Sequence, residues 1–160
     1  MTDKKQELID KYHQWRAGWE ALVQQVGEER MEQPGKDGGW SFKDLAGHLG
    51  YWWGYEAGRL EAALSGVPPT SEWDRDVDLQ NEQAYEINKD RSASAVLADV
   101  DVALGRVEAA LNALPDGALF DVGRYPWSPG LALGPEVVAA LREHMYDEHR
   151  DDIEYWRSET

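Results

Sequence analysis

The stretch "GWSFKDLAGHLGYWWGYEAGRLEAALSG", residues 39–66, shows most clearly what kind of fold the chain forms. It opens with Ser41 and Asp44, the spacing of a capping box, in which two side chains bond each other's backbone N–H groups at a helix start. Apolar residues then recur every three or four positions until the helix breaker "SGVPP". We therefore predict an amphipathic α-helix from Ser41 to about Leu64.

Three other long segments have the same helical period, and none of the chain alternates as a strand does. They are residues 3–31, residues 92–114 (with Ser92 or Ser94 at the start) and residues 135–156, where Pro135 suits a first helical turn. Four long helices in 160 residues predict an all-α four-helix bundle that forms one domain over residues 1–160. A connection over residues 65–89, with a short helix in "DVDLQNEQAYEIN", predicts a long crossover between the second and third long helices.

The composition limits the partners and the chemistry. A net charge of -15 and a pI near 4.5 argue against nucleic acid and anionic membranes, because phosphate binding needs clustered Lys and Arg. There is no Cys, so any thiol used in a reaction has to come from a cofactor or a substrate. No signal peptide and no run of about 18 apolar residues is evident, so we expect a cytoplasmic protein. Eight Trp and seven Tyr suggest an aromatic pocket or interface.

A helical residue turns by about 100°, and from this angle the direction of each side chain can be calculated. Two of the predicted helices, over residues 41–64 and 135–156, then direct polar groups toward the core. In the helix over 41–64, whose stripe includes Leu45, Leu49, Trp52 and Ala63, Glu56 lies near the centre, with His48 and Arg59 on its shoulders. Buried charges are expensive unless they are paired or bind a metal. We therefore predict a cavity between the helix over residues 41–64 and the helix over residues 135–156. The plainer alternative is a His–Asp hydrogen bond plus a Glu56–Arg59 pair at the edge of the bundle.

The last helix contains "REHMYDEHRDDIEYW", residues 142–156, which holds two histidines five positions apart. Its apolar stripe passes through Met145, and regular helical geometry places His149 and Asp152 inward. The same geometry places His144 about 140° from His149. His144 is therefore expected on the outside, and His13, on the first helix, is also expected at the surface.

The segments quoted above, together with "VDLQNEQAYEIN" and "HMYDEHRDDIEYW", resemble the DinB-like superfamily of four-helix bundles, most closely its ClbS/DfsB-type branch. The resemblance implies an up-down-down-up helix order. It also implies a divalent metal, held by one His of the second helix and a His-x-x-x-His pair of the last. Some members use a low-molecular-weight thiol such as mycothiol, and the ClbS-type branch suggests a role in stress or detoxification.

Carried over to this chain, the resemblance matches His48 and His149 to metal ligands, but Met145 falls where the third histidine is expected. A thioether suits Cu(I) and poorly replaces imidazole for Zn, Ni or Fe. Two alternatives could complete the site. A π-bulge could turn His144 inward, or Asp152 or Glu56 could supply a carboxylate ligand.

Two functions are compatible with these residues. The first is an enzyme, a hydrolase or thiol-dependent transferase acting on an electrophilic small molecule, using either a metal or His149 as a base oriented by Asp152 or Glu56. Its cavity would be walled by Trp127 and Trp156 and by the residues expected to bind the cofactor or substrate, Trp52, Tyr55, Arg59 and Tyr85. The alternative is a non-catalytic small-molecule-binding protein or a dimeric scaffold with a degraded metal site. A homodimer is expected in either case.

Overall fold

The computed structural model describes residues 1–69 and 76–158, and within these ranges the chain is helical with no β-strand. The seven α-helices are α1 (Asp3–Val26), α2 (Phe42–Ser65), α3 (Val77–Asn88), α4 (Ala93–Ala113), α5 (Asp116–Phe120), α6 (Leu133–Glu143) and α7 (Arg150–Ser158). Two 3₁₀ turns, η1 (Glu28–Arg30) and η2 (Lys36–Gly38), lie between α1 and α2, and a π-helical segment, η4 (His144–Glu148), follows α6. The predicted all-α class is confirmed.

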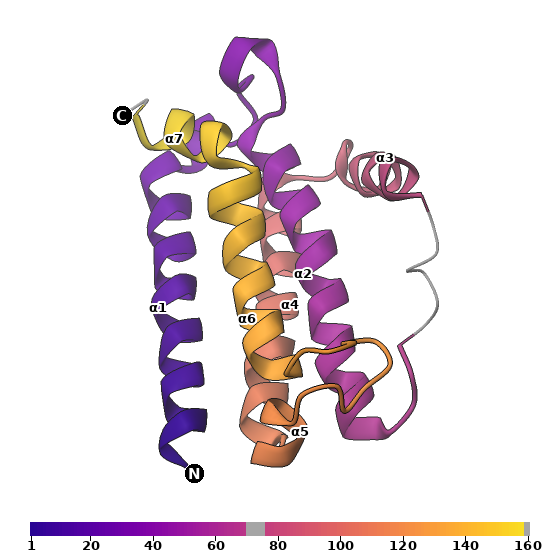
Figure 1. Cartoon of the computed structure of the whole chain (residues 1–160). Coiled ribbons are helices and arrows are strands. Elements are labelled where there is room, and N and C mark those ends of the chain that lie inside the picture. Colours follow the sequence, from indigo (N-terminus) through magenta and orange to yellow (C-terminus); the bar gives the residue numbers. More distant parts are fainter. Residues whose placement is uncertain (70–75, 159–160) are drawn as a thin grey trace.

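The four long helices run up, down, down and up in the order α1, α2, α4, α6 (Figure 1). Since α2 and α4 run in the same direction, the chain has to return along the bundle between them, and this return passes through α3. The predicted crossover and its short helix are therefore confirmed. Residues 70–75 of the predicted connection lie outside the described residues.

The start of α2 forms as its sequence predicts. The Ser41 hydroxyl accepts from the Asp44 backbone N–H at 3.1 Å, and the Asp44 carboxylate accepts from the Ser41 backbone N–H at 3.1 Å. The helix ends where Gly66 adopts a left-handed conformation (φ 72°), which costs glycine little because it has no Cβ. These caps fix where α2 begins and therefore which way His48 points.

The core follows the predicted apolar stripes with one correction. The stripe residues of α1 and α4 are buried, but in α2 the tryptophan of the core is Trp53 rather than Trp52. Trp53 is fully buried and packs edge-on against Trp15 and Trp19, with ring centroids 5.0 Å apart in each case. Trp52 is only half-buried, which leaves it free to line a cavity.

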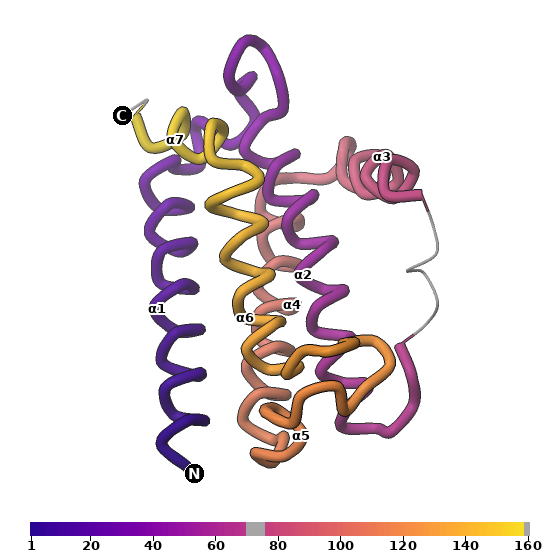
Figure 2. Tube along the Cα trace, viewed as in Figure 1, coloured from indigo at the N-terminus to yellow at the C-terminus, as the bar shows by residue number. Residues whose placement is uncertain are grey.

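The predicted single helix over residues 135–156 is wrong. Instead, α6 ends at Glu143, the π-helical segment follows, and the backbone breaks at His149 (φ -109°, ψ 26°) before α7. Figure 2 shows α7 turning away from the direction of α6 and across the end of α1. Ile153 and Trp156 of α7 are still buried, so this turn closes the core at that end. The first helix also stops earlier than predicted, at Val26 instead of near Met31.

No helix within residues 1–69 and 76–158 has the length and apolar character needed to cross a lipid bilayer.

Candidate metal centre

Three histidine rings converge at the end of the bundle where α2 meets η4. The Nε2 atom of His48, on α2, lies 3.0 Å from Nε2 of His144 and 3.0 Å from Nε2 of His149. One ring nitrogen from each residue lies within 4.8 Å of the others, and within the described residues this is the group of side chains that could hold a metal ion. Their donor atoms therefore point at one small volume.

The π-helical segment explains how two histidines five positions apart can share this volume. In a regular α-helix they would point about 140° apart. In a π-turn, residue i+5 bonds back to residue i, so the two lie one above the other. The expectation that His144 faces outward is therefore wrong, and the π-bulge alternative is the one that the chain adopts.

Met145 stands four residues before His149, where a regular helix would place a metal ligand, but its side chain does not point toward the histidines. Its side chain is fully buried among the apolar residues of the core. Because of the extra residue in the π-turn, His144 instead of Met145 lies beside His149 in the site. The set of three histidines is therefore completed by His144 and not by a residue at position 145.

Their surroundings keep two of the histidines, His48 and His144, neutral at neutral pH. Burial lowers the pKa of His48 to about 4, with a further lowering by His149. Burial likewise lowers the pKa of His144 to about 3, helped by His48 and His149. A neutral imidazole presents a lone pair to a metal, whereas an imidazolium does not. At neutral pH His48 and His144 are therefore available as metal-binding donors.

The spacing fits a small divalent ion. Two ligands bonded to Zn²⁺ at about 2.0–2.1 Å in a tetrahedron lie about 3.3 Å apart, close to the observed 3.0 Å between nitrogens. Three histidines with a free fourth position are the arrangement of a catalytic zinc site. The Nδ1 atom of His48 is buried with no hydrogen-bond partner among the described residues, so this ring is oriented by packing, for example against Trp40 at 5.2 Å.

The two carboxylates predicted as catalytic groups lie outside the three-histidine group. Asp152 is half exposed, and its Oδ2 is 3.5 Å from Nδ1 of His149, where it can orient that ring. Glu56 instead accepts from Arg59 at 2.9 Å. Burial raises the pKa of Glu56 and Arg59 opposes this rise. Arg59 also binds Glu136 at 2.7 Å and so ties α2 to α6.

A cavity of about 530 Å³ surrounds the cluster. Besides the three histidines, its walls are Trp40, Trp52, Trp53, Glu56, Val77, Asn81, Ala140, Glu143 and Glu148. Of the predicted binding residues only Trp52 is among these, and its indole N–H donates to Asn81 of α3 at 2.8 Å. The others have different places. Tyr85 stacks on Trp40 from outside with centroids 6.5 Å apart, while burial and Glu56 raise the pKa of Tyr55.

Sequence reasoning missed Trp40, Glu143 and Glu148. Trp40 could have been found, because it stands directly before the N-cap Ser41 and so has to lie at the end of α2 near His48. The two glutamates could not, because their direction depends on the π-turn. They give the cavity a negative wall without Lys or Arg, whereas Glu56, which also lines the cavity, is paired with Arg59.

An up-down-down-up helical bundle with histidines from its second and last long helices converging at one end defines a DinB-like protein. The chain belongs to the mycothiol maleylpyruvate isomerase N-terminal domain family, part of that superfamily, whose family model matches residues 12–154. Searches of curated proteins and of solved structures find no match.

Proposed function

We propose that the protein is a metal-dependent enzyme that joins a low-molecular-weight thiol, such as mycothiol, to an electrophilic small molecule in the cavity beside the histidines. The observation that carries this proposal is the convergence of the three Nε2 atoms of His48, His144 and His149. Membership of a family named after a mycothiol-linked isomerase supports the thiol. The chain itself has no cysteine that could take its place.

In the proposed reaction, the residues of the site have different roles. His48, His144 and His149 would hold Zn, Ni or Fe, the ions that suit imidazole. A bound ion of this kind lowers the pKa of a coordinated thiol or water and so supplies a nucleophile at neutral pH. Asp152 orients His149 from outside the cluster, and Trp40 and Trp52 provide apolar walls against which a flat substrate can pack.

The charge of the cavity bears on the substrate. Maleylpyruvate, which gives the family its name, carries two carboxylates, but Glu56, Glu143 and Glu148 line this cavity without any Lys or Arg. Arg59, which contacts Glu56, is also paired with Glu136. A dicarboxylate would meet like charge at this wall. We infer that the electrophile is uncharged or cationic.

The non-catalytic alternative rested on the methionine in a ligand position, and it loses that support because His144 fills the position. Placement in the ClbS/DfsB-type branch, hydrolysis as a second activity, a role in detoxification, a homodimer, a one-domain protein and a cytoplasmic location all stay predictions.

The metal content of untagged protein tests the proposal. We expect about one Zn, Ni or Fe per chain, and loss of that metal in His48→Ala and in His149→Ala. The control is His13→Ala, which removes a half-exposed histidine that pairs with Glu108 far along the bundle, and it should leave the metal content unchanged. Metal-free protein that also shows no thermal shift with added Zn, Ni or Fe would contradict the metal centre.

Activity is tested separately with the metal-loaded protein. The rate of thiol consumption is measured with mycothiol and 2-cyclohexenone, an uncharged electrophile, and with mycothiol and maleate, a dicarboxylate. We expect turnover of the uncharged compound that His48→Ala abolishes, and a weaker reaction with maleate. Equal or faster reaction with maleate would overturn the inferred substrate charge without touching the metal centre.

A further inference from the structure

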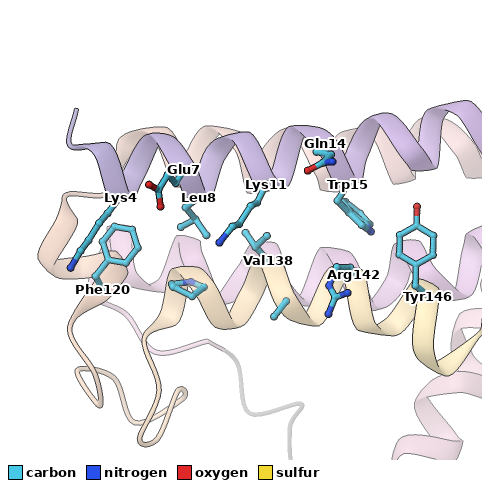
Figure 3. A pocket seen from close by; sticks show the side chains of 12 residues that line it. Lys4, Glu7, Leu8, Lys11, Gln14, Trp15, Phe120, Val138, Arg142 and Tyr146 are labelled. Atoms are coloured by element: carbon cyan, nitrogen blue, oxygen red, sulfur yellow. The ribbon is translucent and has the colours of Figure 1, made fainter.

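A second cavity, here called the α1–α6 groove, lies between these two helices and shares no lining residue with the histidine cavity (Figure 3). It measures about 680 Å³, within the usual range for small-molecule sites. Its apolar part is formed by Leu8, Trp15, Phe120, Pro135, Val138 and Ala139. The groove thus offers a continuous apolar surface to a ligand.

The charged side chains of the groove reverse the balance of the whole protein. The chain has 31 acidic residues against 16 Lys and Arg, yet the groove is lined by Lys4, Lys11 and Arg142 against one carboxylate, Glu7. The cations come from both walls, since Lys4 and Lys11 belong to α1 and Arg142 to α6. An anion in the groove would be attracted by both helices.

These three cations also differ from most others in having no partner. In residues 1–69 and 76–158, the side chains of Lys4, Lys11 and Arg142 take part in no ion pair, hydrogen bond or ring contact. Elsewhere cations are engaged, as when Arg16 binds Glu108 at 2.9 Å and Arg106 binds Glu61 at 2.7 Å. Free cations beside an apolar surface are what an amphipathic anion requires.

The α1–α6 groove also contains a hydrogen-bond donor, the indole N–H of Trp15, without an acceptor in the part of the chain that the structure describes. Trp15 is 5% exposed, and its indole N–H is buried without a hydrogen-bond acceptor among the described residues. Figure 3 shows the Trp15 ring reaching from α1 toward Tyr146 at one end of the groove. Buried donors are normally satisfied, so a ligand acceptor at this end would remove a cost.

We propose that the α1–α6 groove binds an amphipathic organic anion, a carboxylate with an apolar body. The body would lie on Leu8, Trp15 and Val138, and the carboxylate would be attracted by the cations that line the groove, Lys4 and Lys11 from α1 and Arg142 from α6. A second copy of this chain fits less well because its net charge of -15 is repelled by an identical charge. The site does not depend on the proposed metal chemistry.

The test uses untagged protein kept metal-free with EDTA, so that its result does not depend on the histidine centre. The protein is titrated calorimetrically with dodecanoate below its micelle concentration, and in parallel with dodecyltrimethylammonium and decyl glucoside. We expect dodecanoate to bind at least about tenfold more tightly than the cationic and neutral amphiphiles, because charge attraction adds to the same apolar contact.

Three variants locate the site. Lys11→Glu combined with Arg142→Glu should weaken dodecanoate binding by at least about tenfold, and Glu7→Gln should tighten it. The matched control, Lys36→Glu with Arg124→Glu, makes the same charge change at half-exposed residues outside the groove and should alter binding by less than about twofold. Circular dichroism checks that each variant is folded.

Four results would overturn the proposal. They are no dodecanoate binding by the wild type, equal binding of all three amphiphiles, equal weakening by the groove pair and the control pair, and a dimer that the groove pair dissociates. The last result would assign the groove to a second copy of the chain.

Discussion

The two sides of the segment formed by α6 and η4 differ in charge and in the cavity that each side lines. One side, with Glu143, His144 and Glu148, faces α2 and lines the histidine cavity. The other side, with Val138, Arg142 and Tyr146, faces α1 and lines the α1–α6 groove. Along a few turns of helix, two carboxylates and the neutral imidazole of His144 are therefore separated from an unpaired cation. The comparison teaches that one irregular element can build two chemically opposite surfaces.

The largest expected effect concerns which residue of η4 binds the metal. His144→Ala should lower metal affinity by at least about 100-fold, because a ligand is lost and not merely an orienting partner. Adding Met145→His to this variant should not restore binding, since residue 145 points into the core, and it should destabilise the fold by about 1–3 kcal/mol. Competition with a chromogenic zinc chelator measures the affinities, and urea unfolding measures the stability. Rescue by Met145→His would mean that the helix is regular.

The histidine side should also respond to acid more strongly than the cationic side. The folded pKa of His48 is about 4, below the unfolded value of 6.5, so the unfolded chain takes up the proton first. The stability that this provides is complete above pH 6.5 and is lost as pH falls from 6.5 toward 4. Between pH 7 and pH 5 we expect His48 alone to cost metal-free protein roughly 2 kcal/mol.

Urea unfolding of the EDTA-treated protein at the two pH values measures this loss. His48→Gln should reduce the difference by about that amount, and the pair Lys11→Glu and Arg142→Glu should leave it unchanged. An equal pH dependence in wild type and His48→Gln would contradict the burial of a neutral His48.

A smaller effect is expected at Gly18, where α1 meets the cationic side. A Cβ at this position would lie 2.6 Å from the hydroxyl of Tyr146, so Gly18→Ala has to displace that side chain of η4. We expect metal affinity to fall by about threefold to tenfold, since small displacements of a ligand-bearing segment weaken a site. Gly105→Ala is the control, because a Cβ there meets nothing within 4 Å. Unchanged affinity in Gly18→Ala would show that the two sides of η4 are independent.

The smallest effect is expected from removing the extra residue of the π-turn. Deletion of Asp147, which is exposed, brings the two histidines to i, i+4 spacing in a regular helix, where they share a face. Metal affinity should then stay within about threefold of the wild type, measured by the same chelator competition. Complete loss of binding would show that the π-turn does more than set the direction of His144.

The sequence was sufficient for the regular parts of the fold. The capping box at Ser41 and the stripes of α1 and α4 depend on local spacing, which fixes the helix direction and the buried face. It was ambiguous for Trp52 and Trp53, because adjacent tryptophans lie only about 100° apart on a helix. The choice between them was made by packing against α1, which no local pattern contains.

The site was predicted less well, for a physical reason. The direction of His144 depends on one residue more than a regular helix accommodates, and helical arithmetic assumes a constant turn. The sign that could have decided it was the separation of His144 and His149 by five positions, one more than the spacing that the DinB-like resemblance implies. The α1–α6 groove could not be predicted, because Lys11 and Arg142 line one groove only when α1 and α6 lie side by side.

The most direct test is a crystal structure of zinc-loaded protein with an anomalous difference map at the zinc edge. We predict one zinc ion bonded to Nε2 of His48, His144 and His149 at about 2.0–2.1 Å, with residues 144–148 in a π-turn and Met145 in the core. A zinc ion held by Met145 or by carboxylates, with His144 turned toward solvent, would contradict the account.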